Sequence, residues 1–250
     1  MASPPFSQDM AAQAEPGDPA RRRLIAAGAS AALIATGGLL VPAHAAEASA
    51  GGEDVSATED LMREHGVLRR TLIVYAEIAG RLRSKPAEVD GGALVEAARL
   101  FRAFGEEYHE RSLEERFIFP EVRRAGGGPV RLVEILLAQH QRGREITDYI
   151  QATARSGRIG TGDAEPLARA LEGMARMYQA HAAWEDTLVF PAWKKTQSAD
   201  RLKEMAERFE ELEHQQFGKD GFDDAVERIG RIEQTLGLAD LAHYTAPSPR

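Results

Sequence analysis

Residues 109–120 read HERSLEERFIFP, and residues 181–191 read HAAWEDTLVFP. Both stretches begin with histidine, carry two adjacent acidic residues and end in Phe-Pro, and their prolines lie 71 positions apart. The segments that precede them match as well, since LMREH ends at His65 and LLAQH ends at His140, 75 positions later. The chain is therefore interpreted as two helix pairs. Each pair supplies a histidine from its first helix and a histidine with a glutamate from its second.

Apolar residues recur at intervals of three and four throughout this region, which is the periodicity of an amphipathic helix. Breaks rich in glycine and proline separate the periodic segments. Long helices are predicted at 56–83, 93–123, 130–155 and 164–196, the last capped by Asp163. Further helices are predicted at 199–217 and 221–236. No window alternates with period two, so we expect an all-α, up-down antiparallel four-helix bundle with extra C-terminal helices.

The first 45 residues have the order of a cleaved export signal. Three arginines, Arg21 to Arg23, precede an uncharged stretch that ends in the small-residue pattern Ala43-His44-Ala45. The run RRRLI also resembles the twin-arginine export motif, which implies export in the folded state to a periplasmic or secreted location. A membrane anchor is the alternative, but glycine, serine and threonine dilute the apolar run. We expect a linker at 46–55, the bundle at 56–196, and a C-terminal helical extension and tail at 197–250.

Composition excludes several classes of function. The formal net charge is -8, so no basic face is available for nucleic acid. No basic amphipathic stretch follows the leader, and we expect no membrane contact after the signal is cleaved. The chain has no cysteine, which excludes disulfides, thiolate nucleophiles and cysteine-ligated clusters. Any metal ion must therefore be held by nitrogen and oxygen.

The repeated histidines and glutamates predict a metal site inside the bundle. His181 and Glu185 are four residues apart, so they project from one face of their helix. Together the two helix pairs bring four histidines and two carboxylates to one centre, and the predicted ligands are His65, His109, Glu114, His140, His181 and Glu185. Mixed imidazole and carboxylate ligation suits iron or manganese, and zinc less well, because six candidates exceed the four ligands of structural zinc.

The second helix departs from regular spacing. His109 and Glu114 are five residues apart, which turns them to different faces of a regular α-helix. Either a π-bulge restores the common face or Glu106, one turn earlier, replaces Glu114. Glu114 is preferred because the repeat aligns it with Glu185, and Glu115 is a spare ligand. Glu64, next to His65, is expected to face solvent.

The order of these motifs over residues 56–195 resembles the haemerythrin-like, HHE cation-binding family. The resemblance implies a four-helix bundle with two bridged, non-haem iron ions, the four histidines acting as terminal ligands and the two glutamates as bridges. Members of that family bind oxygen, store or sense iron, or react with nitric oxide or peroxide. The resemblance therefore implies a small diatomic molecule or peroxide as the ligand, and it identifies no redox partner.

One position departs from the oxygen-carrying members of that family. They have a second histidine on the third helix, four residues after the first, where this chain has Arg144. An additional open position on the metal favours reaction over reversible carriage. His214 could supply the missing nitrogen if the fifth helix folded over the end of the bundle.

Three functions are consistent with the sequence. The first is a di-iron protein that binds or activates oxygen, nitric oxide or peroxide. The second is a non-catalytic iron-binding or regulatory bundle, in which the metal only stabilises the fold. The third is a purely structural bundle whose histidines are incidental. Metal content and the response to oxygen separate the three.

Overall fold

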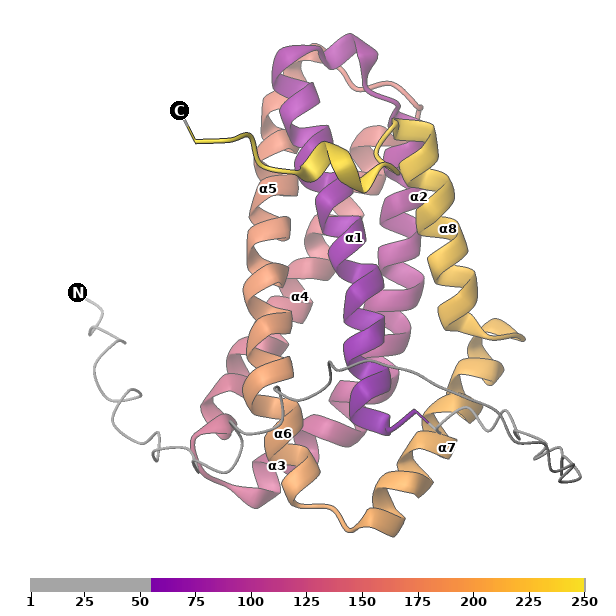
Figure 1. Ribbon diagram of the computed structural model, residues 1–250. Helices are drawn as coiled ribbons and strands as arrows, with labels where there is room; N and C mark the ends of the chain where they lie inside the picture. Colours follow the sequence, from indigo (N-terminus) through magenta and orange to yellow (C-terminus); the bar gives the residue numbers. More distant parts are fainter. Residues whose placement is uncertain (1–54, 250) are drawn as a thin grey trace, which may run out of the picture. The chain divides into compact units, whose positions relative to one another are not determined.

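The computed structural model describes residues 55–249, and all of the secondary structure in this range is helical. The expected export signal at 1–45, and all but the last residue of the expected linker at 46–55, lie outside the described residues. Four long rods and two further helices follow one another along the chain (Figure 1). This arrangement confirms the predicted all-α bundle with extra C-terminal helices.

The first and third rods are single helices, α1 (Ala57–Ser84) and α4 (Pro129–Ala154). The second and fourth rods each run through a π-helical segment. The second consists of α2 (Gly91–Leu100), η4 (Phe101–Ile118) and α3 (Phe119–Ala125). The fourth consists of α5 (Thr161–Trp184), η5 (Glu185–Val189) and α6 (Phe190–Lys195). The C-terminal extension holds α7 (Ala199–Phe217) and α8 (Gly221–Leu236), and the short 3-10 turns are η3 (Pro86–Glu88) and η6 (Leu241–Tyr244). All predicted helix boundaries lie within three residues of these.

Short polar side chains begin several of these helices by accepting a hydrogen bond from a free backbone N–H. Ser56 accepts from Glu59 at 3.3 Å, Asp90 from Ala93 at 3.0 Å, and Ser198 from Arg201 at 3.1 Å. The expected cap of α5 is different. Asp163 lies within the first turn of that helix, which begins at Thr161 after Gly160. The prediction that Asp163 is the cap was therefore wrong.

The two π-helical segments end in the same way. The N–H of Phe119 bonds to the carbonyl of Glu114, and the N–H of Phe190 bonds to the carbonyl of Glu185, each five residues back. A proline follows in both rods and cannot donate to the backbone ladder, so the widened turn precedes a break in that ladder. Residues five apart share a face in π-helical geometry. The sequence prediction of a π-bulge between His109 and Glu114 is therefore confirmed.

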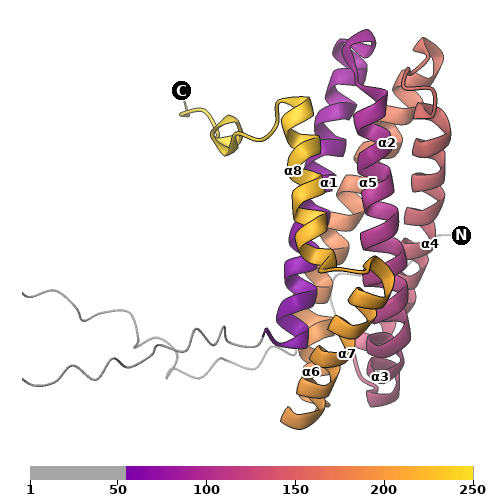
Figure 2. The ribbon, with the colours of Figure 1, turned by 90° about the vertical axis from the view of Figure 1, so that its right-hand side faces the viewer.

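The rods pack around one apolar core, with α1 and α4 both lying against α5 and α2 lying against α4. At one end Trp193 of α6 is fully buried and donates from Nε1 to Glu121 of α3 at 2.6 Å. The extension covers one side, where α8 lies along α1 and α2, and α7 packs on α1 and η4 (Figure 2). Arg70 of α1 donates to Glu233 of α8 at 2.9 Å. Among the described residues, no helix has the length and apolar character needed to cross a membrane.

Candidate metal centre

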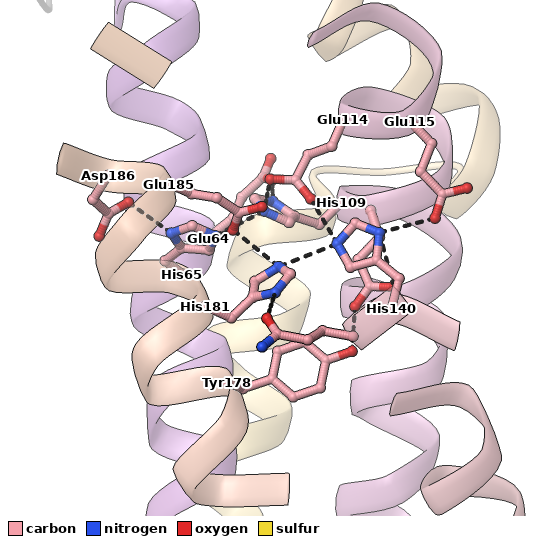
Figure 3. Close-up of polar contacts among 12 residues, drawn as sticks. Glu64, His65, His109, Glu114, Glu115, His140, Tyr178, His181, Glu185 and Asp186 are labelled. Atoms are coloured by element: carbon pink, nitrogen blue, oxygen red, sulfur yellow. Dashed lines mark hydrogen bonds and ion pairs between the residues drawn. The ribbon is translucent and has the colours of Figure 1, made fainter. Parts of the chain in front are cut away.

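One histidine from each rod points into the centre of the bundle (Figure 3). His65 comes from α1, His109 from η4, His140 from α4 and His181 from α5, and all four are buried. The Nε2 atoms of His65 and His109 are 3.0 Å apart, and those of His140 and His181 are 3.1 Å apart. The imidazoles therefore form two pairs, one from each repeat of the sequence.

The spacing within each pair fits a shared cation. A metal–nitrogen bond is about 2.1 Å long, so two nitrogens at right angles on one metal lie about 3.0 Å apart. Two neutral nitrogens at hydrogen-bond distance in a buried site otherwise need a proton between them. The geometry thus provides one cation position for the first helix pair and one for the second.

Glu114 and Glu185 lie between the two histidine pairs. The Glu114 oxygens are 3.3 Å from Nε2 of His109 and 3.3 Å from Nε2 of His140, so this carboxylate faces both pairs. Glu185 Oε2 is 3.4 Å from His65 and 3.1 Å from His181. Both glutamates are 0% exposed, and none of their four oxygens accepts a hydrogen bond from the described residues. Burying an ionised carboxylate that accepts no hydrogen bond costs free energy, and bound cations would offset that cost. The donor set therefore fits the binding of metal ions.

The other nitrogen of each imidazole, Nδ1, is held by an acceptor from a different rod. These partners are Asp186 for His65 at 2.7 Å, Glu64 for His109 at 2.5 Å, Glu115 for His140 at 2.9 Å and Gln139 for His181 at 2.9 Å. An ionised carboxylate and an amide oxygen only accept, so each Nδ1 carries a proton and each Nε2 points inward. Nε2 is therefore the nitrogen that each imidazole offers to a cation.

The outer partners follow the internal repeat. Glu64 and Gln139 each directly precede the histidine of the first helix of their pair, and each holds the histidine of the second helix. Glu115 and Asp186 each follow the glutamate that faces the centre, and each holds a histidine of the opposite pair. The site thus has an approximate twofold symmetry, which the duplication in the sequence builds.

Burial and charge act in opposite directions on the pKa of these groups. Burial by itself would lower the pKa of His140, but Glu110, Glu114 and Glu115 outweigh it and raise the pKa to about 10. Burial likewise opposes a rise in the pKa of His109, yet the neighbouring Glu114 and Glu64 raise it well above its usual value. When no cation is bound, protons on the imidazoles neutralise the buried carboxylates, and a cation replaces them.

Arg144 takes a different role from the histidine that oxygen carriers have at this place. Its guanidinium donates to Glu115 at 2.5 Å and to Glu110 at 3.1 Å. Glu110 also accepts from the hydroxyl of Tyr178 at 2.7 Å. Arg144 therefore holds the carboxylates around His140 instead of binding a metal.

A small cavity of about 10 Å³ adjoins the centre. It is lined by His65, Leu68, Arg69, Leu72, His109, Glu110, Tyr178, His181 and Ala182. This volume is close to the minimum needed for one water molecule. Only a very small ligand fits beside the histidines without movement of the surrounding side chains.

The structure brings together all six predicted ligands and corrects one expectation beside them. Glu64 is 1% exposed and is not solvent-facing, because it turns inward to His109. The alternative ligand Glu106 is buried elsewhere, where it accepts from Thr147 at 2.5 Å. Glu115 contacts Nδ1 of His140 and lies outside the central pair of carboxylates. His214 is exposed on α7, so it does not supply the missing nitrogen.

Sequence reasoning missed the residues that hold Nδ1. A signal was present for two of them, because the second acid of the acid-acid pair recurs in both repeats as Glu115 and Asp186. Glu64 and Gln139 also recur, each directly before a histidine, but adjacent helix positions point in different directions, so Glu64 was expected to face solvent. No pattern pointed to Tyr178. Side-chain contacts between rods depend on how each helix is rotated, which the sequence pattern does not give.

The fold and the site together define a four-helix bundle with a buried cluster of histidines and glutamates that can hold cations. The hemerythrin HHE cation binding domain matches residues 56–193 and, in a second match, residues 131–243. The first match covers more than half of the chain, so this protein belongs to the haemerythrin HHE cation-binding family. The two matches begin 75 positions apart, the spacing that separates His65 from His140.

The chain is also similar to uncharacterized proteins from Mycobacterium tuberculosis and Mycobacterium bovis. Each is 41% identical over 192 residues, which span 76% of this chain and 74% of the relative. No solved structure matches the chain. The comparisons therefore give the family and a capacity for cation binding.

Proposed function

We propose that this protein binds two bridged, non-haem iron ions and that the centre binds or reacts with oxygen, nitric oxide or peroxide. The observation that carries the proposal is the pairing of four buried Nε2 atoms around carboxylates that lack hydrogen-bond donors. In this scheme His65 and His109 hold one ion, His140 and His181 hold the other, and Glu114 and Glu185 bridge them. Imidazole and carboxylate ligands together suit iron.

When iron is bound, the centre would supply electrons to a small ligand. The chain's own residues would limit the size of that ligand and hold a proton beside it. The four imidazoles and two glutamates would hold the ions with few donors for each, so a small ligand would have room to bind. The small cavity has room for about one water molecule, so a diatomic ligand would need a small movement of the lining side chains. Burial and the charge of Glu110 raise the pKa of Tyr178 well above its usual value, so its hydroxyl stays protonated and holds a proton beside the cavity.

Metal analysis and an optical spectrum test the proposal. Anaerobic addition of ferrous iron to the metal-free protein should give about two ions per chain, and exposure to air should give an oxo-bridge absorption band. The double variant His109→Ala/His181→Ala should bind little iron, because it removes one nitrogen from each pair. Wild-type protein that binds no iron would refute the proposal, as would equal binding by the variant.

A non-catalytic iron-binding or regulatory role is the second candidate. The closeness of the packing around the cavity favours it. It requires tight binding of iron without any spectral change on exposure to oxygen, nitric oxide or peroxide. The same reconstituted sample, mixed with each ligand in turn, separates the two roles.

Export is a further part of the proposal. The RRRLI run and the Ala43-His44-Ala45 pattern support a twin-arginine-type signal that is cleaved near residue 45 and a periplasmic or secreted location. Folded export suits a protein that acquires its metal in the cytoplasm. The double variant Arg21→Lys/Arg22→Lys should leave the full-length chain in the cytoplasm, whereas the wild-type chain should be recovered outside with a new N-terminus near residue 46.

A further inference from the structure

We propose that an acidic groove beside α7 collects divalent cations and delivers them to the metal centre through Glu64. The inference rests on the proposed metal function, since it concerns how the same centre is filled. The groove has a volume of about 460 Å³ and lies where α7 and the start of α8 meet the beginning of α1. Its acidic lining residues, which define the acidic groove, are Asp60, Glu207, Glu210, Glu213 and Asp220.

The charge of the groove is strongly unbalanced. Five acidic side chains face two basic ones, Arg63 and Lys203. Arg63 lies 3.6 Å from Asp60 and its guanidinium carbon is 4.3 Å from the centre of the Phe222 ring, so it is held at the wall. A concave site lined by one sign of charge raises the local concentration of counter-ions and their rate of association. The acidic groove therefore attracts cations from solvent.

The turn between α7 and α8 places Glu213 in the wall of the groove. The backbone N–H of Phe222, in the first turn of α8, donates to Glu213 Oε1 at 2.7 Å. Gly221 permits this approach, because a Cβ there would lie 2.9 Å from the Glu213 side chain and 2.3 Å from that of Phe217. The C-terminal extension thus builds one wall of the acidic groove and holds the Glu213 carboxylate there.

Glu64 lies on α1 between the groove residue Asp60 and the ligand His65. It lies four residues after Asp60 on α1, and residues at this spacing share one face of a helix. Its Oε2 accepts from His109 Nδ1 at 2.5 Å, whereas its Oε1 is buried and has no hydrogen-bond partner among residues 55–249. A charged side chain that is 1% exposed with one free oxygen is suited to a passing cation.

The charge of Glu64 affects the pKa of two carboxyl groups in the acidic groove. Burial, followed by the charge of Glu64, raises the pKa of Asp60 to about 6 despite the nearby Arg63. Burial, with the charges of Asp220, Glu64 and Asp60, raises the pKa of Glu213 to about 7 against the donation from Phe222. Glu64 is thus close enough to both groove carboxyls to act on their pKa, and above about pH 7 the groove carboxyls are mostly ionised and can attract a cation.

The other three residues that accept a hydrogen bond from a histidine Nδ1 differ from Glu64 in charge. Asp186, beside His65, is paired with Arg69, and Glu115, beside His140, is paired with Arg144. Gln139, beside His181, is neutral. No ion pair with arginine or lysine is formed by Glu64 within the described part of the chain. A cation approaching the centre therefore meets a guanidinium paired with the outer partner of His65 or of His140, whereas Glu64, the outer partner of His109, carries no such pair.

The rate of metal loading tests this inference. Metal-free protein is mixed with Co²⁺ at low ionic strength, and the visible absorption of bound Co²⁺ is followed with time, which needs no oxygen chemistry. Asp60→Asn/Glu213→Gln should load about tenfold more slowly than wild type and reach the same final Co²⁺ content. Added salt should remove most of the difference, because it screens the exposed charges.

Two further variants test whether slower Co²⁺ loading depends on the charges of the groove itself. Glu165→Gln/Glu172→Gln removes the same number of charges near Arg83, twenty-three residues along α1 from Asp60 and about 35 Å away. This control should load at the wild-type rate. Glu207→Gln/Glu210→Gln changes only exposed groove residues, so it should fold normally and also load more slowly.

The outcomes separate the inference from the function on which it rests. If both groove variants load Co²⁺ at the wild-type rate, the acidic groove does not deliver cations to the centre. Equal slowing of the Glu165→Gln/Glu172→Gln control would also contradict the inference. Wild-type protein that binds neither Co²⁺ nor Fe²⁺ would overturn the metal function itself. Groove variants that load Co²⁺ slowly but reach the wild-type Co²⁺ content support both the groove and the metal function.

Discussion

At the scale of single residues, the acceptors on Nδ1 set the direction in which each imidazole presents its lone pair. A histidine ring can rotate and exchange tautomers unless its second nitrogen is held. Here each Nδ1 has an acceptor from another rod at 2.5–2.9 Å. Such outer contacts raise metal affinity by 10- to 100-fold in proteins where they have been removed.

Asp186 offers a direct test at this scale. Asp186→Ala should weaken Co²⁺ binding by about 10-fold, because His65 loses the acceptor that orients it. Asp186→Asn keeps an acceptor oxygen and should lose much less. Competition with a chelator of known affinity measures both. Equal losses in the two variants would mean that the charge of Asp186, through its pair with Arg69, matters more than its hydrogen bond.

At the scale of elements, the two π-helical segments and one glycine position the rods. The π-helical geometry of η4 brings Glu114 to the face of His109, which a regular helix of the same sequence would not do. Gly143 of α4 has a comparable effect between rods. A Cβ at this position would lie 2.0 Å from the hydroxyl oxygen of Tyr178 on α5.

Gly143→Ala should therefore disrupt the packing of α4 against α5. The Tyr178 ring must move and lose its hydrogen bond to Glu110, which should lower the free energy of unfolding by about 1–3 kcal/mol. Urea unfolding of the metal-free chain measures the loss. Gly173→Ala is the matched control on α5, since nothing lies within 4 Å of its Cβ, and it should be neutral or stabilising.

A second substitution checks the cause. In the background of Gly143→Ala, Tyr178→Phe removes the closest atom and should restore part of the lost stability. If Gly143→Ala is as stable as Gly173→Ala, the close approach between these rods does not constrain the fold.

At the scale of the whole molecule, cations and protons compete for the same buried charges. The pKa of His140 is raised to about 10 in the folded chain, against 6.5 for the ordinary side chain. The folded state therefore binds more protons than the unfolded state between these values, and the stability of the metal-free protein falls as pH rises through this window. Bound metal ions remove this dependence because they replace the protons.

Removal of the metal should accordingly have a larger effect in alkaline solution. We expect chelation to lower the melting temperature at pH 9 by more than at pH 6, as measured by calorimetry on matched samples. The variant His109→Ala/His181→Ala provides the control, since chelation should leave its melting temperature nearly unchanged at both values. An equal effect of chelation at the two pH values in the wild-type chain would contradict this competition.

The sequence determined the helices, their boundaries and the residues that converge on the centre. Helical periodicity, the glycine breaks and the 71-residue duplication depend on local spacing, and local spacing is fully visible in a sequence. The tertiary structure alone decided which nitrogen of each histidine faces inward, which partner holds the other nitrogen, and that Glu64 is buried. It also decided that α7 and α8 cover α1 and form an acidic groove beside it. These features join residues up to 163 positions apart, and they depend on how each rod is rotated against its neighbours, which spacing along one helix does not specify.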